Sequence, residues 1–166
     1  CEGAIKIDDL KDFSKENKIK SLALSDTTNL CGALEFAEKI SKVGTQPIIG
    51  TQINFRFSGT TGLLPLYALN EAGYKRIIEL SSLSFLKNDK LSDPHLEFED
   101  LLKNNDGLAL FSGTIYGLFG QLFDKGKFSE ISELYSKLKS CYQDKFYIEI
   151  QRHNEQNEFA FEKFNL

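Results

Sequence analysis

The sequence predicts an α/β protein, in which strands alternate with helices. Along the 166 residues, the apolar spacing switches repeatedly between a helical period and the shorter period of strands. Two short apolar segments, 21–25 and 107–113, have the composition of buried strands. Strands separated by helices favour parallel pairing, because a parallel neighbour needs a long crossover connection. The pattern leaves open whether the strands close into a barrel or form an open sheet.

The first half of the chain is expected to hold a helix over 7–17, a strand over 21–25, a helix over 31–42 and a β-hairpin made of 47–57 and 63–69. Asp8 and Asp9 suit the first turn of the first helix, where the helix dipole favours negative charge. Leu34 and Ile40 are spaced for the inward face of the second helix, and Gly44 is placed to end that helix.

The second half is expected to hold a helix over 71–87, a short helix over 97–103, a strand over 107–113, helices over 116–124 and 128–141, a strand over 146–150 and a further helix from Phe159. Gly126 separates the two helices in the middle of this series. In the long helix, the inward residues are predicted to be Tyr74, Ile77, Ile78 and Leu80.

Functional groups of α/β folds gather at the carboxyl ends of the strands, which directs attention to the turns after residues 25, 49, 112 and 150. Asp26 and Asn29 in the first of these turns could bind a metal or a phosphate. The favoured interpretation is helix capping, since both side chains can accept hydrogen bonds from the amides that open the next helix. The turn with Ser112 and Thr114 precedes a helix and gives a weak signal for an anion site.

Several classes of site are excluded or disfavoured. The chain has no HExxH, GxSxG or GxxxxGK[ST] motif, so hydrolase chemistry would depend on carboxylates alone. His95 follows Pro94 in a polar link and is expected to be exposed, and His153 has no neighbour in sequence that would complete a ligand pair. The 14 Phe and 6 Tyr fall mostly at inward positions without interleaved basic residues, which favours core packing over base stacking.

The cysteines and the apolar runs indicate a cytoplasmic protein. Cys1, Cys31 and Cys141 form neither a CxxC pair nor a Cys/His cluster, so neither a disulfide framework nor a zinc ribbon is expected. No apolar run approaches the roughly 20 residues that cross a bilayer, and no membrane contact is expected. Because the chain begins at Cys1 and contains no Met, we expect a segment of a longer reading frame. The rival interpretation is a lipid-anchored protein whose first residue is a lipidated cysteine.

Seven segments, in order along the chain, share short motifs with one known family. They are EGAIKIDDL (2–10), LALSDTTNLCGALEF (22–36), QPIIGTQ (46–52), ALNEAGY (68–74), IELSS (78–82), GLALFSG (107–113) and FYIEIQRH (146–153). The family counterparts are LDGAAKIDDLV, ALTDHGNMFGAVEFY, KPIIGCE, AKNEEGY, LMKLVS, GLIALSG and FYLELQRH. Together these segments resemble the PHP domain at the start of bacterial DNA polymerase III alpha subunits.

The resemblance implies a distorted (β/α)7 barrel of the TIM-barrel-like PHP type. Residues 1–166 would form a partial PHP domain with about five of the strands. The first strand, with its His-x-His motif, would precede Cys1, and the closing strands would follow Leu166. Two strands, 21–25 and 146–150, would then present unpaired edges.

The resemblance also implies a lost metal site. Active PHP proteins hold about three metal ions with His, Asp, Glu and Cys side chains. The family's ligand positions fall on Glu2, Thr27, Gln52, Leu63 and Thr114 of this chain, and only the first of these is still a ligand of the expected kind. No catalytic residue, metal or other cofactor is therefore expected in this segment.

The implied role is a structural or interaction domain in DNA replication. In the family, this domain packs against the rest of the polymerase chain, and in some bacteria it docks the separate proofreading exonuclease subunit. Nucleotide transfer would come from carboxylates that bind Mg²⁺ in a palm domain outside this segment. The alternative is a stand-alone metal-dependent PHP phosphoesterase, which requires intact ligands at Thr27, Gln52, Leu63 and Thr114.

The segment is expected to bind DNA weakly or not at all at physiological salt. Its formal charge is −4 and its lysines are scattered, so few counterions would be released from the phosphates. Fluorescence anisotropy with labelled duplex and primed DNA measures this directly. A sub-micromolar dissociation constant near 150 mM salt would contradict the expectation.

Overall fold

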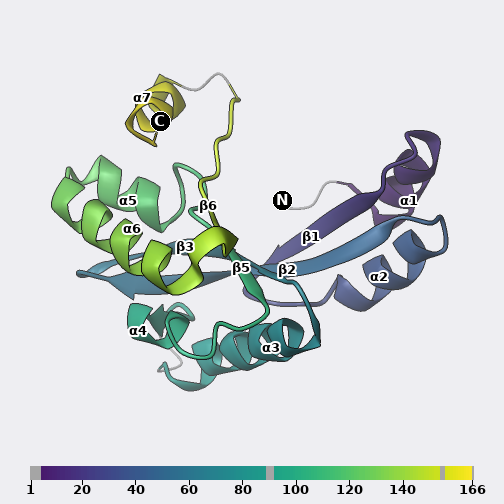
Figure 1. Ribbon diagram of the computed structural model, residues 1–166, viewed down its shortest axis with the longest axis horizontal. Helices are drawn as coiled ribbons and strands as arrows, with labels where there is room; N and C mark the ends of the chain where they lie inside the picture. The colour runs from purple at the N-terminus through teal and green to yellow at the C-terminus, as the bar shows by residue number, and fades with distance from the viewer. Residues whose placement is uncertain (1–4, 89–91, 154–155, 166) are drawn as a thin grey trace.

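A mixed β-sheet organises the fold. The computed structural model describes residues 5–88, 92–153 and 156–165 (Figure 1). Within these residues the strands are β1 (Ser21–Thr27), β2 (Gln46–Phe57), β3 (Thr60–Ala68), β4 (Leu96–Glu97), β5 (Leu108–Phe111) and β6 (Phe146–Tyr147). The helices are α1 (Ile7–Glu16), α2 (Ala33–Ser41), α3 (Glu71–Leu86), α4 (Phe98–Leu101), α5 (Leu118–Asp124), α6 (Phe128–Tyr142), the 3₁₀ turn η1 (Gln143–Lys145) and α7 (Gln156–Asn165).

The strand order is β1-β2-β3-β5-β6, and β4 adds to the far end of β2. β1 runs parallel to β2 and β5 runs parallel to β6. β2 and β3 form an antiparallel hairpin, and β3 is also antiparallel to β5. The prediction of an α/β fold is confirmed, and so is the hairpin. The expectation of parallel pairing holds for β1–β2 and β5–β6 but not for every pair of strands. The short turn after Phe57 reverses the chain between β2 and β3, and β3 is antiparallel to β5 although helices connect them.

Alternation along the strands gives the sheet two chemically different faces. One face carries side chains that are completely buried in a single core cluster, among them Ile53, Phe55, Leu64, Leu66, Leu108 and Leu110. Most of the remaining members come from helices α3, α4, α5 and α6, and α7 adds Phe161. Burying each such side chain contributes roughly 1.5–3 kcal/mol relative to leaving it in water. The intervening strand residues point to the opposite face, away from these helices.

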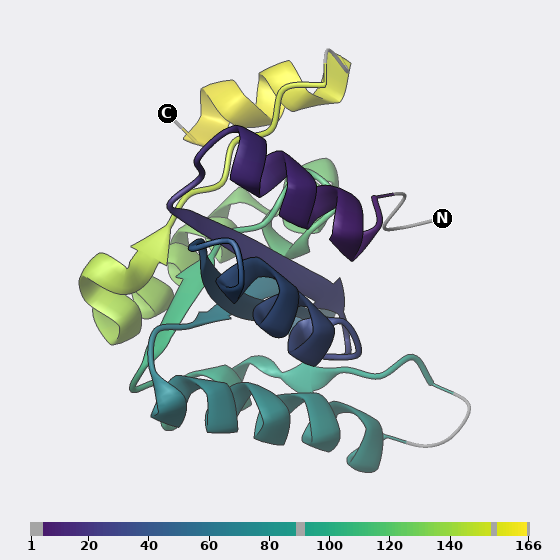
Figure 2. The same ribbon diagram turned by 90° about the vertical axis from the view of Figure 1, so that its right-hand side faces the viewer.

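Helices α1 and α2 lie together at the N-terminal end of the sheet, apart from α3 (Figure 2). The Lys39 ammonium on α2 donates to Asp8 on α1 at 2.8 Å. A buried hydroxyl pair, Ser14 and Thr45 at 2.6 Å, joins the end of α1 to the turn before β2. Polar contacts therefore hold α1 in place, because Ser14 is its only buried residue. No helix among the described residues is long and apolar enough to cross a membrane.

The inward face of α2 differs from the prediction. Leu34 was expected inside but is 81% exposed. The helix begins at Ala33 rather than Cys31, and its buried stripe consists of Ala33, Phe36 and Ile40. These positions follow the spacing i, i+3, i+7 of a helix that lies against a sheet. Leu34 is one position away from that stripe and faces solvent.

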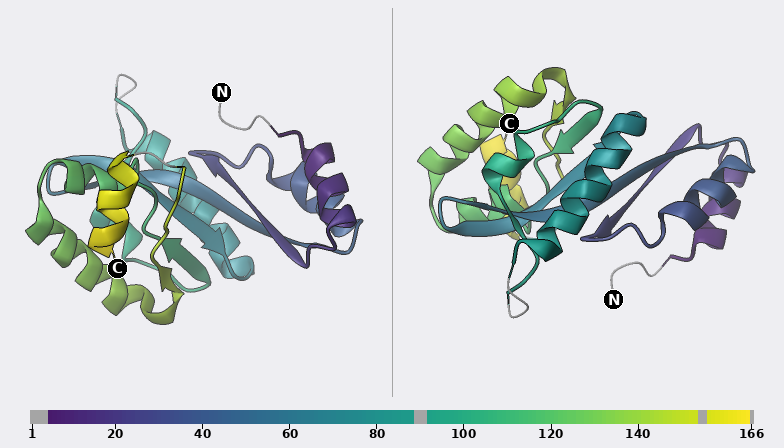
Figure 3. Two further views of the ribbon diagram at one scale, coloured as in Figure 1. Left: turned by 90° about the horizontal axis from the view of Figure 1, so that it is seen from above. Right: turned by 90° about the horizontal axis from the view of Figure 1, so that it is seen from below.

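Only two of the four residues predicted to face inward from α3 are buried. Ile77 and Leu80 are completely buried, whereas Tyr74 and Ile78 are 38% and 43% exposed. The orientation is set where Gly73 meets the turn before β5: a Cβ at Gly73 would lie 1.8 Å from a backbone carbonyl oxygen there. Since only glycine permits this approach, the side of α3 that bears Gly73 and Ile77 faces the sheet. Figure 3 shows α3 lying across the sheet when the molecule is seen from below.

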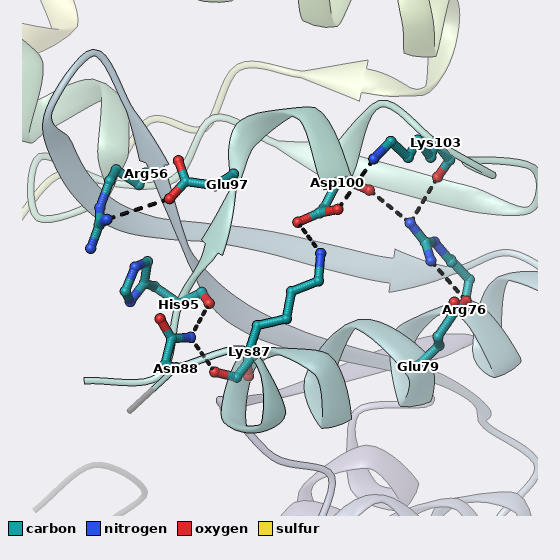
Figure 4. A network of polar contacts seen from close by, with 10 residues as sticks. Arg56, Arg76, Glu79, Lys87, Asn88, His95, Glu97, Asp100 and Lys103 are labelled. Carbon is teal, nitrogen blue, oxygen red and sulfur yellow. Dashed lines mark hydrogen bonds and ion pairs between the residues drawn. The ribbon is translucent and has the colours of Figure 1, made fainter. Parts of the chain in front are cut away.

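His95 was predicted to be exposed, and this is wrong: it is 8% exposed. The segment that contains His95 lies against the sheet, because the next residue, Leu96, pairs with Phe55 of β2. The Asn88 amide donates to the backbone carbonyl of His95 at 2.5 Å (Figure 4). The Nδ1 atom of His95 lies 2.8 Å from the backbone carbonyl oxygen of Asp93. The histidine is therefore a part of the scaffold.

A buried arginine joins α3 to α4 (Figure 4). Arg76 donates to the backbone carbonyls of Asp100 at 2.7 Å and Lys103 at 3.0 Å, and it pairs with Glu79 at 2.7 Å. The Asp100 carboxylate accepts from Lys87 at 2.8 Å. Burial opposes ionisation of Asp100, but the bonds to Lys87 and Lys103 outweigh it and lower its pKa. These contacts satisfy the last turn of α4, which is too short to be stable alone.

Replacing Gln143 with glycine is expected to stabilise the protein. Gln143 ends α6 with φ +54° and ψ −114°, a conformation that costs a residue with a Cβ roughly 1–3 kcal/mol and glycine much less. The hydrogen bond from Lys139 goes to the backbone carbonyl of Gln143 and is kept. Chemical denaturation should show a gain of about 1 kcal/mol. Gln143→Ala is the matched control, and an equal gain for both variants would contradict the strain argument.

Candidate functional site

An open hollow of about 990 Å³ lies on the polar face of the sheet. Four of the five positions to which the sequence assigns former metal ligands line it: Thr27, Gln52, Leu63 and Thr114. All four side chains are partly exposed. The fifth position, Glu2, lies outside the described residues. Residues from well-separated parts of the sequence, Thr27 to Thr114, are thus brought to one site.

Strand register explains why three of these residues meet. Thr27 of β1 pairs with Gln52 of β2 in the parallel ladder. Gln52 pairs in turn with Pro65 of β3, so Leu63 is one step along the same face. Directly paired residues share a face, and so do residues two apart in a strand. The neighbours of Gln52 in sequence, Thr51 and Ile53, are completely buried on the opposite face.

Thr114 reaches the hollow from the loop after β5, which lies tightly against β3. Leu63 and Gly117 form an isolated bridge between the two segments. A Cβ at Gly117 would lie 2.8 Å from the Leu63 carbonyl oxygen, so a larger residue would push the loop away. Gly113 turns the chain with φ +77°. The Thr114 hydroxyl accepts from the Tyr116 amide at 3.1 Å, which fixes its direction at the edge of the hollow.

Asp26 and Asn29 accept backbone hydrogen bonds in the turn after β1, but the prediction that they cap the next helix is wrong, because α2 begins after Gly32, its N-cap residue, and has no side-chain capping bond. The Asp26 carboxylate accepts from the Gly32 amide at 2.9 Å, and the Asn29 side chain accepts from the Cys31 amide at 2.9 Å. Asn29 also donates to the Thr27 carbonyl at 2.8 Å. The side chains of Asp26 and Asn29 both line the hollow, but these bonds occupy them with the backbone. Their main role is to shape the turn.

His153 reaches the same hollow from the segment after β6. It has a partner that the sequence analysis missed: Glu158, on α7, lies 2.8 Å from its Nδ1 atom and accepts from its amide at 2.6 Å. Beside this pair, Arg152 donates to both oxygens of Glu162 at 3.1 Å. The spacing of Glu158 and Glu162, one helical turn apart, was the available signal. These two pairs of side chains attach α7 to the segment that follows β6.

Three of the four turns expected to carry functional groups contribute to the hollow: those after residues 25, 112 and 150. The expectation for the turn after Ile49 is wrong, because β2 continues to Phe57 and contributes Gln52 from its middle. Sequence reasoning also missed the lining residues Cys31, Tyr116 and Gln151. Cys31 and Gln151 lie within two of the segments that resemble the family, but no ligand position was assigned to them.

The side chains around the hollow do not fit a metal cluster. Among the described residues, no three His, Cys, Asp or Glu side chains lie close enough together to hold a metal ion. Leu63 offers no lone pair, and the threonine hydroxyls and the Gln52 amide are poor substitutes for carboxylate, imidazole and thiolate ligands. No reaction step can be derived through a metal here.

Burial changes the ionisation of two groups near the base of the hollow. The pKa of Glu149 is raised by burial, an effect that a hydrogen bond from Gln151 at 2.9 Å partly offsets. The pKa of Tyr67 is raised chiefly by burial and further by the Glu149 charge. Tyr67 lies on the polar face opposite Gly50, where any Cβ would collide with its ring. This region favours uncharged side chains.

Glu149→Gln is expected to raise the stability of the protein at neutral pH. The folded state holds the Glu149 proton more tightly than the unfolded state does, so stability falls as pH rises from the unfolded pKa through the raised folded pKa. Glutamine removes this penalty, and the gain should disappear below the unfolded value of about 4.3. The melting temperature of both proteins across pH measures it.

Glu162→Gln is the matched control for that experiment. The bond from Arg152 lowers the pKa of Glu162, so this variant should lose stability at neutral pH, with the difference vanishing in acid. A loss of stability for Glu149→Gln at neutral pH would contradict the argument.

Comparison with known proteins identifies the family. The PHP domain family model matches residues 1–153. The DNA polymerase III alpha subunits of Caulobacter vibrioides, Rickettsia felis and Borreliella burgdorferi are 36%, 34% and 32% identical to the chain, each over 92% of its length. The chain spans only 13–14% of the length of these relatives. A solved Bifidobacterium adolescentis structure described as a metal-dependent phosphoesterase aligns with 13% identity and a TM-score of 0.38, covering 87% of this chain and 54% of that one, which is too distant to bear on fold or chemistry. The chain belongs to the PHP domain family.

Proposed function

We propose that this chain serves DNA replication as part of the PHP domain of a DNA polymerase III alpha subunit, where it is a structural and interaction domain without metal chemistry of its own. One observation carries the second half of the proposal. Thr27, Gln52, Leu63 and Thr114, which correspond to the family's His, Glu, His and Cys ligands, line one hollow. The first half is supported by the similarity to alpha subunits along 92% of the chain.

The chemistry of the hollow argues against hydrolysis. A metal-dependent phosphoesterase needs cations to polarise the phosphoryl group and to generate hydroxide from water. Such cations need several anionic or imidazole ligands at once. Leu63 places two methyl groups where the family has an imidazole, which would also leave neighbouring charges without a partner. A stand-alone PHP phosphoesterase, the second candidate, has no observation in its favour here.

The sheet topology supports a barrel that is open within this chain. β1 and β6 are the two ends of the strand path, and the strand residues of the core cluster share one face of the sheet. In a closed (β/α)7 barrel the helices surround the outer face, and polar site residues gather on the inner face near one rim. In this chain too, the core side chains of the strands lie on one face of the sheet and the residues of the hollow lie on the other. We assign residues 1–166 to an incomplete barrel of this kind.

The proposed partners follow from the relatives. The rest of the alpha chain would cover the open edges, and the proofreading exonuclease subunit is a second proposed partner. Nucleotidyl transfer would belong to carboxylates elsewhere in the polymerase, together with the Mg²⁺ ions that they bind. The proposed site of action is the cytoplasm, where replication takes place in bacteria.

The chain is expected to bind no stoichiometric Zn²⁺ or Mn²⁺ and to hydrolyse no phosphoester. The physical reason is the replacement of ligands at Thr27, Gln52, Leu63 and Thr114. A variant with Thr27→His, Gln52→Glu, Leu63→His and Thr114→Cys should gain transition-metal binding, because these changes return ligands of suitable type to one hollow. Elemental analysis after dialysis, with a p-nitrophenyl phosphate ester as substrate, measures both properties.

A triple variant that keeps Leu63 is the matched control. If the leucine is the decisive loss, the triple variant should bind metal at least about tenfold more weakly than the quadruple variant, a difference of roughly 1.4 kcal/mol. Two or more equivalents of metal on the unmodified chain would overturn the assignment of a lost site. If the quadruple variant binds metal as weakly as the triple variant and the unmodified chain do, the assignment of these four positions is contradicted.

A further inference from the structure

Two lysines converge at the turn of the β2–β3 hairpin, on a part of the molecule remote from the hollow. The Lys127 ammonium donates to the Ser58 carbonyl at 2.7 Å and to the Thr60 hydroxyl at 3.4 Å. The Lys125 ammonium donates to the same Thr60 hydroxyl at 3.4 Å. Both lysines come from the α5–α6 connection, which turns at Gly126 with φ +67°. Figure 1 shows this connection on the same side as the hairpin turn.

The other cations near this turn are compensated by carboxylates. Arg56 pairs with Glu97 at 3.4 Å, and Lys137 pairs with Glu133 at 2.7 Å while lying over the ring of Phe57. Among the ion pairs of the described residues, none involves Lys125 or Lys127. The positive charge at the hairpin turn is therefore concentrated on these two residues.

One carboxylate acts on this pair from further away. Glu130 accepts a hydrogen bond from the Ser129 hydroxyl at 2.7 Å, and its pKa is lowered chiefly by that bond and only to a small degree by the Lys127 charge. It forms no ion pair within 4 Å with either ammonium. Glu130 thus gives the two cations no direct counter-charge.

The shared Thr60 hydroxyl holds the two cations together without neutralising them. The Thr60 side chain is completely buried, and its oxygen accepts from both ammonium groups. The two nitrogens therefore lie within about 7 Å of each other, where like charges repel by roughly 0.6 kcal/mol even in bulk water. A lysine ammonium has only donors, so neither can satisfy the other.

We infer that Lys125 and Lys127, held together by Thr60, form a binding site for a phosphate group. An anion between the two nitrogens would receive a charge-assisted hydrogen bond from each and would remove their repulsion. Lysine binds phosphate as a point charge that can approach from any direction, whereas planar carboxylates are better matched by the fork of arginine. The site is independent of the proposed function, because it shares no residue with the hollow.

The expected affinity is low. Both ammonium groups are at the surface, where each ion pair contributes about 0.2–1 kcal/mol, and the chain as a whole carries a charge of −4. A single phosphate subsite of this strength is compatible with weak binding of DNA at physiological salt. It would act as one contact within a larger assembly.

The site is tested by NMR, with the ¹⁵N-labelled chain titrated with inorganic phosphate. Phosphate replaces chloride during the titration, so that the ionic strength stays constant. Saturable amide shifts are expected at residues 58–60 and 125–128. Lys127→Gln should weaken binding roughly threefold and the double change of Lys125 and Lys127 to Gln roughly tenfold. Lys145→Gln is the matched control and should leave the shifts unchanged, because Lys145 is a partly exposed lysine in η1, beyond the other end of α6.

Two further measurements complete the test. Phosphate should raise the melting temperature of the unmodified chain but not that of the double variant, which separates binding from a defect in folding. A short single-stranded DNA shifting the same amides would assign the site to a phosphodiester backbone, and a response to inorganic phosphate alone would assign it to free phosphate. Equal shifts with chloride, or shifts that survive the double change, would overturn the inference.

Discussion

The register of β2 is the constraint on which the rest of the structure depends. This twelve-residue strand pairs with β1, β3 and β4, and its alternation sends Ile53 and Phe55 into the core while Gln52 faces the hollow. A slip of one residue would exchange the two faces, placing an amide in the core and apolar side chains in the hollow. The burial of Ile53 and Phe55 therefore fixes the position of Gln52 and, through pairing, that of Thr27.

This separation of faces means that the side chains lining the hollow can change without loss of core packing. The core cluster lies on the side of the helices, so changes at Thr27, Gln52 or Leu63 remove nothing from it. The hollow depends on the close approach of the loop after β5 to β3. Gly117 permits this approach beside Leu63, because it has no Cβ. Backbone geometry and core packing thus set the shape of the hollow independently of the side chains that line it.

Local signals in the sequence predicted the parts of the structure that depend on local physics. The hairpin turn follows from neighbouring residues and was predicted correctly. Asp26 and Asn29 accept from backbone amides as expected, but these amides belong to the turn and precede α2. Burial of His95 depends on a two-residue strand that joins β2 across forty positions, which no local pattern reveals. The direction of α3 likewise depends on contact with a distant turn. The four site positions came from family resemblance, and their convergence required the strand register.

The most direct test of the central claim is anomalous diffraction from crystals of the chain soaked in Mn²⁺. The account predicts that Thr27, Gln52, Leu63 and Thr114 line one hollow on the face of the sheet opposite the core, and that no anomalous peak lies among them. A peak within about 2.5 Å of side-chain oxygens or nitrogens in that hollow would contradict the claim that the scaffold is kept and the metal chemistry lost.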